Sequence, residues 1–332
     1  MMQSLGRLTA IVGRAAAVAA MVAAVLASGG RSVRADSFPA RPVKIIVQTA
    51  AGSSIDVAAR LVAENLSRIW GQQAFVVNQP GAGGALAARA LASAPPDGET
   101  LLLAASSIFV ALPELQKDQA ASIDAFVPVA YVGEQPMVVV VGANEGIKTF
   151  PELLTRIRQT PGGMNCAVST RGGLSHLSAE SLKAAAGAEM TFVHYPGTAQ
   201  ALSDVISGRV PMGIDSLSAF FGPAAGGQIR IVAIASTARL KKLPEVPTVA
   251  ETIPGFEAIA WLALVAPPGT PAALAAKIGA DVDRVLADPD VVKRMDEIGN
   301  FVHPMTTAEL AAFIKAQRAQ WLPVVQKFGV AP

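Results

Sequence analysis

The stretch Val43-Lys44-Ile45-Ile46-Val47-Gln48-Thr49 and the turn after it, Ala50-Ala51-Gly52-Ser53-Ser54-Ile55-Asp56, decide the fold. The first seven residues are mostly apolar and β-branched and lie between Pro42 and Gly52, which predicts a buried strand. From Ile55 to Trp70 an apolar stripe at helical spacing predicts a helix. A strand, a turn of small residues and a helix N-terminus therefore follow one another.

A second unit of the same kind comes directly afterwards. The turn Asn78-Gln79-Pro80-Gly81-Ala82-Gly83-Gly84 lies between a strand predicted at 74–77 and a helix of small residues predicted at 82–92. Another strand is predicted at 100–105. This βαβαβ order is typical of a parallel, doubly wound sheet, so we assign the chain to the α/β class.

The second half of the chain repeats this pattern from Val138 onward. Strands are predicted at 138–141, 165–168, 191–194, 210–214, 229–235 and 258–266. Three late helices, beginning near Ala272, Asp288 and Thr307, are expected to return to the first half. The pattern predicts two doubly wound domains joined by a hinge, domain 1 at 36–137 plus 262–332 and domain 2 at 138–261.

The first 35 residues have the features of a secretory signal peptide. Arg7 and Arg14 form a positive region, and Ala15–Ala27 form an apolar segment of 13 residues, which is short for a membrane span. We expect cleavage after Ala35 and export to a periplasm; an uncleaved signal anchor is the alternative. The leader holds four of the 27 basic residues and none of the 25 acidic ones, so the mature chain carries two more acidic than basic residues. Nucleic acid is therefore not an expected partner.

Cysteine and histidine offer little chemistry in this sequence. Cys166 is the single cysteine and lies in an apolar stretch, so we expect a buried thiol. The three histidines show no metal-ligand spacing, and no metal or other cofactor is expected. No GxSxG elbow occurs, but a Ser-His-Asp arrangement of Ser169 or Ser175 with His194 and Asp215 would make the chain a periplasmic serine hydrolase, which stays open as an alternative.

Hydroxyl side chains collect where predicted strands end and helices begin. They are Ser53, Ser54, Ser106, Ser107, Ser169, Ser175 and Thr198. In open α/β sheets that edge is where ligands bind, and a helix N-terminus with hydroxyl groups can hold a carboxylate without a buried cation. For each residue alone, helix capping is the competing interpretation.

Two acidic residues lie at the same edge. We expect Asp56, one turn inside the first helix, to support the helix N-terminus or a turn amide. Asp215 is open to three interpretations: it binds a ligand amine, pairs with a positive side chain, or repels diacids. The Gly81–Gly84 turn lacks the ending of a phosphate-binding loop, and tight packing of its helix is at least as good an explanation as ligand contact.

Several short motifs together resemble one family. They are Arg41-Pro42-Val43-Lys44-Ile45-Ile46-Val47, the Gly52–Asp56 turn, Asn78–Gly84, Pro96-Asp97-Gly98-Glu99-Thr100-Leu101-Leu102, Ser175-His176-Leu177, His194-Tyr195-Pro196-Gly197, Leu243-Pro244-Glu245-Val246-Pro247-Thr248-Val249-Ala250-Glu251 and Ala266-Pro267-Pro268-Gly269-Thr270-Pro271. Over nearly the whole mature chain, the sequence resembles the substrate-binding receptors of tripartite tricarboxylate transporters, also called Bug-type receptors.

The resemblance implies a bilobal periplasmic-binding-protein fold that closes on a small carboxylate and delivers it to a membrane permease. A sensory receptor without transport is a further alternative. We expect a monomer, and the resemblance implies a binding protein with no enzymatic activity. By that pattern one wall of the ligand site would be Ser53, Ser54 and Ser106, and the other Ser169, Ser175, Tyr195, Thr198 and Asp215.

Three positions depart from the family pattern. Ser53 stands where the family usually has a second glycine, which adds a hydroxyl group and removes backbone freedom, so we expect the first loop to bind a different group. Pro196 occupies the neighbourhood of a usual lysine, and Glu99 replaces a usual aromatic residue. We expect the last two to be surface or packing changes.

Overall fold

The computed structural model describes residues 38–169 and 171–328. The predicted signal peptide and its cleavage site lie outside these residues. From Pro39 onward the chain forms one compact unit. Among the described helices, none is long and apolar enough to cross a membrane.

One half of the sheet, called half A here, contains the strand that opens the chain. β1 (Val43–Val47) lies between β2 (Ala74–Asn78) and β3 (Thr100–Ala105) and is parallel to both. β9 (Ile259–Ala266) then pairs antiparallel with β3, and the first part of β4 (Val127–Gly142) pairs antiparallel with β9. The strand at the end of the second half of the sequence, β9, thus pairs with the first half of the sheet.

The long strand β4 continues into a second half, called half B. Its residues from Met137 onward pair antiparallel with β7 (Met212–Ser216) on one side and β8 (Ile229–Ile234) on the other. β5 (Met164–Ser169) lies between β7 and β6 (Met190–Tyr195) and is parallel to both. The strand order is β2-β1-β3-β9-β4-β7-β5-β6, with β8 also on β4.

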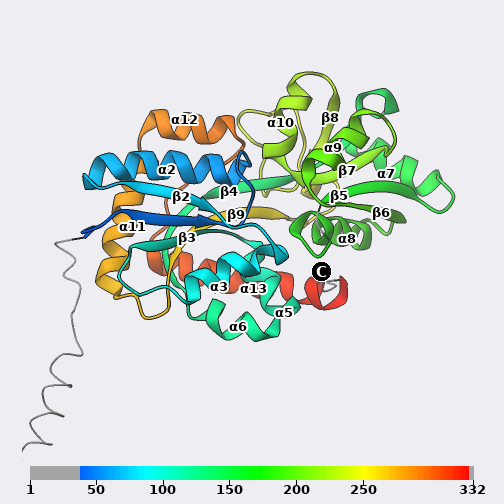
Figure 1. Ribbon diagram of the computed structural model, residues 1–332. Coiled ribbons are helices and arrows are strands. Elements are labelled where there is room, and N and C mark those ends of the chain that lie inside the picture. The colour runs from blue at the N-terminus through cyan, green and yellow to red at the C-terminus, as the bar shows by residue number, and fades with distance from the viewer. Residues whose placement is uncertain (1–37, 170, 329–332) are drawn as a thin grey trace, which may run out of the picture. The chain divides into compact units, whose positions relative to one another are not determined.

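Helices cover both faces of each half (Figure 1). In half A they are α2 (Ser54–Trp70), α3 (Ala85–Ala92), α4 (Ser107–Val110), α5 (Leu112–Leu115), α6 (Lys117–Asp124), α11 (Ala272–Leu286), α12 (Pro289–Glu297) and α13 (Thr307–Phe328). In half B they are α7 (Phe150–Gln159), α8 (Leu174–Ala186), α9 (Thr198–Ile206) and α10 (Leu217–Ala225). Short 3₁₀ turns lie at Ala82–Gly84, Ala143–Glu145 and Val249–Glu251.

The core explains why these residues form a layered fold. Successive side chains of a strand point to opposite faces of the sheet. Val138 and Val140 accordingly pack in one buried cluster with residues of α9 and α10, and Val139 and Val141 in another with residues of α7 and α8. Cys166 is fully buried in the second cluster, as expected, and burial raises the pKa of its thiol.

Two expectations need correction. The parallel pattern holds within β1–β3 and within β5–β7, but the sheet is mixed, because β9 and β4 enter it antiparallel. The strand predicted at 138–141 is also much longer, since it begins at Val127. Pro128 and Pro136 interrupt the sequence pattern there, and the register shifts that accompany such residues appear between Pro128 and Ala130 and between Tyr131 and Gly133.

Candidate functional site

A cavity of about 360 Å³ lies at the strand ends where half A and half B meet. Seven of the eight residues expected to bind a ligand line it: Ser53, Ser54 and Ser106 from half A, and Ser169, Ser175, Thr198 and Asp215 from half B. A volume of this size suits a small organic molecule. The two predicted walls thus face one shared space.

Six helices of eight or more residues begin at this cavity. Their N-cap or first-turn residues belong to its lining, and the helices are α2, α3, α6, α8, α9 and α10. Among the described residues, α8, α9 and α10 have no side chain hydrogen-bonded as their N-cap, whereas Ser53 caps α2. Because uncapped N–H groups carry partial positive charge, the wall of half B favours an anionic group near α8.

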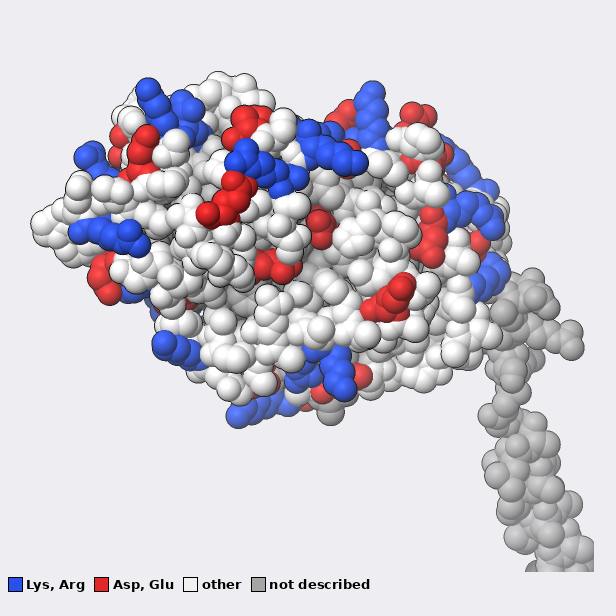
Figure 2. Space-filling view, turned by 180° about the vertical axis from the view of Figure 1, so that it is seen from behind, with Lys and Arg blue, Asp and Glu red and all other residues white. Residues whose placement is uncertain are grey.

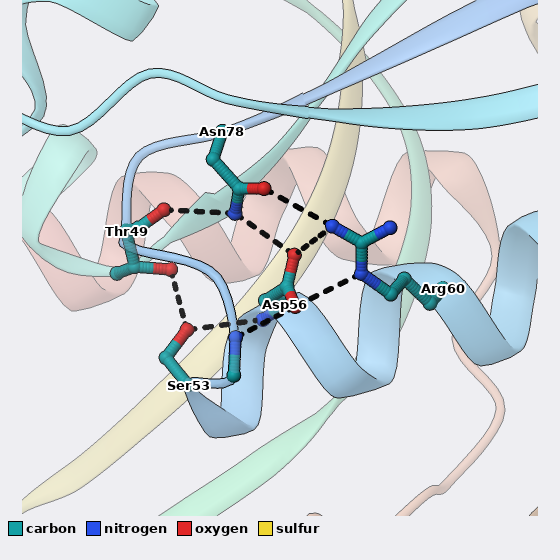
Figure 3. A network of polar contacts seen from close by, with 6 residues as sticks. Thr49, Ser53, Asp56, Arg60 and Asn78 are labelled. Carbon is teal, nitrogen blue, oxygen red and sulfur yellow. Dashed lines mark hydrogen bonds and ion pairs between the residues drawn. The ribbon is translucent and has the colours of Figure 1, made fainter.

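The turn before α2 is a closed network of hydrogen bonds (Figure 3). Arg60 donates from Nε and Nη2 to the two carboxylate oxygens of Asp56, both at 2.9 Å. The Gly52 N–H donates to Asp56 at 2.9 Å and Asn78 Nδ2 donates to it at 2.8 Å. Asp56 therefore supports the turn and the helix N-terminus, as the sequence predicts.

The charge state of Asp56 follows from these partners. Asp56 is 2% exposed. Burial alone would raise the pKa of its carboxyl group, but the hydrogen bonds from Arg60, Gly52 and Asn78 outweigh burial and lower the pKa below its usual value. The carboxylate is thus ionised and matched to a cation.

The hydroxyl group of Ser53 is used inside the same turn. Its Oγ accepts a hydrogen bond from the Asp56 N–H at 3.2 Å and lies 2.7 Å from Oγ1 of Thr49. Ser53 therefore caps the N-terminus of α2 in the structure. Glu99, another departure from the family pattern, lies near the surface and accepts a hydrogen bond from Arg41 Nε at 2.8 Å.

Asp215 at the end of β7 has a different environment. It is 7% exposed, accepts hydrogen bonds from Thr198 Oγ1 at 2.9 Å and from the Ser216 N–H at 2.8 Å, and also interacts with the Ser169 side chain. Burial raises the pKa of Asp215, although these three donors partly oppose the effect. No described Lys, Arg or His forms an ion pair with it.

The remaining hydroxyl groups of the cavity differ in what they contact. Ser175 Oγ donates to the Ile214 carbonyl at 2.5 Å and accepts from the Ser169 N–H at 3.0 Å, so it joins two strand ends. Ser54 Oγ receives only long contacts, 3.3 Å from Ser218 and 3.5 Å from Gln135. The hydroxyl group of Ser106 has no hydrogen-bond partner among the described residues. Ser54 and Ser106 therefore have capacity to bind a ligand.

Tyr195 is the one expected site residue that the cavity lining does not include. Its hydroxyl group donates to Asp204 at 2.8 Å. Burial, together with that hydrogen bond, raises the pKa of Tyr195 to about 12. The side chain lies at the end of β6, on the side of α9 where Asp204 also pairs with Arg209.

Several polar residues of the lining were missed by sequence reasoning, among them Arg171 and Gln135. Arg171 is exposed, and it is the one cation among the described lining residues. It lies inside the polar segment Ser169–His176, which follows a predicted strand, so its position in the sequence could have identified it as a candidate for the lining. Gln135 lies on the part of β4 that the sequence pattern did not reveal.

The Gly81–Gly84 turn both lines the cavity and allows close packing. Gly84 has a φ of +102°, and a Cβ atom there would lie 3.1 Å from Ile108 and 3.2 Å from Gln48. The packing explanation thus has direct support, and the turn's place in the lining also allows ligand contact.

His176 holds the turn that carries Arg171. Its Nδ1 accepts a hydrogen bond from the Gly172 N–H at 3.2 Å, and its Nε2 lies 3.6 Å from Glu180. Burial, together with the charges of His194 and Arg171, lowers the pKa of His176 to about 4. No described serine hydrogen-bonds His176 or His194, so the serine-hydrolase alternative has no geometric support in this part of the chain.

Other kinds of site find little basis in the described residues. No group of three or more His, Cys, Asp or Glu side chains there is placed to hold a metal ion. On the face shown in Figure 2, basic and acidic side chains are interspersed among wide uncharged areas, with no continuous basic band. A small anionic ligand agrees better with the cavity.

Comparison with known proteins decides the family. A family model for the tripartite tricarboxylate transporter family receptor matches residues 58–330. The chain belongs to this receptor family. The family consists of binding receptors, which confirms the expectation of a binding protein and not an enzyme.

Three solved structures show how similar these receptors are. A periplasmic transporter is 33% identical to this chain, with a TM-score of 0.80 over 87% of this chain and 98% of that one. MatC of Rhodopseudomonas palustris with bound malate is 31% identical, with a TM-score of 0.77 over 87% and 100%. R. palustris Rpa4515 with adipate is 30% identical, with a TM-score of 0.80 over 89% and 99%. The expected α/β periplasmic-binding-protein fold is therefore confirmed.

Proposed function

We propose that this receptor binds a small carboxylate in the cavity between half A and half B and delivers it to the membrane components of a transporter. One observation carries the proposal: a single cavity is lined from both halves by helix N-termini, hydroxyl groups and the exposed guanidinium group of Arg171. Relatives that hold malate and adipate support the same ligand class.

The proposed contacts follow from which polar groups have capacity left. In half A they are Ser54 and Ser106, and in half B the first turn of α8 and Arg171, whereas Ser169 and Thr198 already interact with Asp215. Ser53 and Ser175 shape the walls, since their hydroxyl groups already serve a cap and two strand ends. Tyr195 is left out of the proposed contact set.

Closure of the two halves is part of the proposal. Domain 1 would comprise 36–137 plus 262–332, and domain 2 would comprise 138–261. β4 crosses between the halves near Met137, whose N–H donates to the Ala258 carbonyl at 3.1 Å just before β9. A ligand that contacts both walls favours the closed arrangement through its differential contacts. We also propose export by the cleaved leader, action in the periplasm and a monomeric state.

Ligand-induced stabilisation tests this function. The mature protein is heated with a panel of mono-, di- and tricarboxylates and with neutral amides of the same acids. We expect at least one acid to raise the melting temperature, because a ligand that binds the native state alone stabilises it by mass action, and we expect its amide not to do so. Equal shifts with acid and amide, or none with any acid, would contradict carboxylate binding.

Arg171→Gln gives the matched variant for that experiment. Removing the cation should lower the affinity for the tightest-binding acid by roughly tenfold, since a charge-assisted hydrogen bond contributes about 1.5 kcal/mol. Arg156→Gln serves as the control, since Arg156 lies on α7 and outside the cavity lining. An unchanged affinity in Arg171→Gln would remove that side chain from the proposed contacts.

A further inference from the structure

Asp215 is a buried carboxylate at the wall of the ligand cavity, and no cation of the described chain pairs with it. Its neighbours on β5, α9 and β7 supply dipoles alone: the Ser169 side chain, the Thr198 hydroxyl and the Ser216 N–H. A buried charge normally requires a partner, because dipoles replace only part of the lost hydration. Among residues 38–169 and 171–328, this carboxylate has no charged partner.

The carboxylate still has room for one more donor. A carboxylate offers about four acceptor positions, and two hydrogen bonds are identified at Asp215, beside an interaction with the Ser169 side chain. The cation of the cavity, Arg171, forms no ion pair with Asp215 in the described structure. Of the three interpretations left open by the sequence, pairing with a positive side chain is therefore not realised.

A ligand carboxylate would not take the open position. Two ionised carboxylates in contact inside a partly desolvated cavity repel each other, whereas an N–H or O–H group adds a further donor to Asp215. The anionic end of a ligand is better placed at the uncapped N-terminus of α8, beside Arg171. The two ends of the ligand are thus distinguished by charge.

We propose that Asp215 selects acids that also carry a hydrogen-bond donor, an ammonium or a hydroxyl group, and that this donor binds the Asp215 carboxylate. The inference rests on the proposed function, since it concerns the same cavity. The solved relatives leave the choice open, because malate carries a hydroxyl group and adipate does not.

Matched ligand series test the proposal on the unaltered protein. Calorimetry would compare succinate, malate and aspartate, which differ in one substituent, and likewise glutarate, 2-hydroxyglutarate and glutamate, and propionate, lactate and alanine. In the series that binds best, the amino or hydroxy acid should bind at least about tenfold more tightly than the unsubstituted acid, as expected for a hydrogen bond to a charged group. Equal affinities within every series that binds would overturn the inference and leave carboxylate binding intact.

Asp215→Asn separates the two donor classes. The substitution keeps the shape of the side chain and removes its charge. A ligand with an ammonium group should therefore lose about tenfold or more in affinity, and a ligand with a hydroxyl group should lose less. The affinity for an unsubstituted diacid should rise. Asp204→Asn is the control, because Asp204 binds Tyr195 and Arg209 outside the cavity lining. It should leave all affinities unchanged.

The outcomes distinguish the two proposals. If no acid of any series binds, the proposed function fails and this inference falls with it. If acids bind and Asp215→Asn leaves the order within each series unchanged, carboxylate binding stands and the role of Asp215 is refuted. Circular dichroism of each variant tests whether it folds. If Asp215→Asn does not fold, the ligand series measured on the wild-type protein still tests the role of Asp215.

Discussion

Two buried carboxylates lie at the edge of the same sheet, and their surroundings are opposite. Asp56 is 2% exposed and receives hydrogen bonds from Arg60, Asn78 and the Gly52 N–H. Asp215 is 7% exposed and receives hydrogen bonds from neutral donors alone among the described residues. The pKa of the first is lowered and that of the second is raised.

The difference separates a structural acid from one that is available to a ligand. Asp56 is neutralised by Arg60 within α2, so its interactions are complete without any ligand (Figure 3). Asp215 is desolvated without a counter-ion and lines the cavity. Burial alone does not reveal the role of a carboxylate; the charge of its partners does.

The largest expected effect is on stability, from Asp56→Ala. The substitution leaves the Gly52 N–H and Asn78 without their acceptor and removes the partner of Arg60, so we expect a loss of roughly 2–4 kcal/mol in the free energy of unfolding. Arg60 is half exposed, which keeps the loss from being larger. Urea denaturation measures it.

Asp215→Asn provides the other side of this comparison. It should change the unfolding free energy by less than about 1 kcal/mol, because the lost charge was uncompensated. If both variants lose the same stability, the distinction between a paired and an unpaired carboxylate is wrong.

The pH dependence of stability should have opposite signs at the two residues. Asp56 has a lowered pKa when folded, so its contribution is full above the unfolded carboxyl value of about 3.9 and is lost as pH falls through the folded value. Asp215 has a raised pKa when folded, so its contribution is present below about 3.9 and is lost as pH rises through the folded value.

Unfolding curves at several pH values, from about 3 to about 7, would check both signs against each variant. Relative to wild type, Asp215→Asn should gain stability as pH rises, and Asp56→Asn should lose it. Parallel curves for wild type and both variants would contradict the assigned pKa directions.

A smaller effect is expected from Ser53→Ala. Loss of the cap on α2 should cost about 1 kcal/mol of unfolding free energy, since Ser53 Oγ accepts from the Asp56 N–H. Affinity for the best acid should change little, because the hydroxyl group is already used within the turn. A loss of affinity of tenfold or more with unchanged stability would instead make Ser53 a ligand contact.

Much of the fold could be predicted because its local signals agree. The strand at 43–47 and the helix after it follow from side-chain pattern alone. The long strand β4 could not be predicted, because Pro128, Gly133 and Pro136 break the pattern of a strand held mainly by its partners. The antiparallel entry of β9 depends on pairing far along the chain, which periodicity does not encode.

The site was predictable as an edge of the sheet but not as a set of contacts. Hydroxyl residues after strands indicated residues that line one cavity, since strand ends meet at one edge. Whether a hydroxyl group is already hydrogen-bonded within the protein depends on partners elsewhere in the sequence. Examples are Ile214 for Ser175 and Asp204 for Tyr195. The absence of a described cation at Asp215 is likewise visible only when the side chains are placed.

A crystal structure of the mature protein with the tightest acid of the panel tests the central claim most directly. We predict the ligand in the cavity, with contacts from Ser54 or Ser106 in half A and from the first turn of α8 in half B. Its carboxylate should lie on the Arg171 side and its donor group on Asp215. A ligand held by one half alone, or a ligand carboxylate placed against Asp215, would contradict the account.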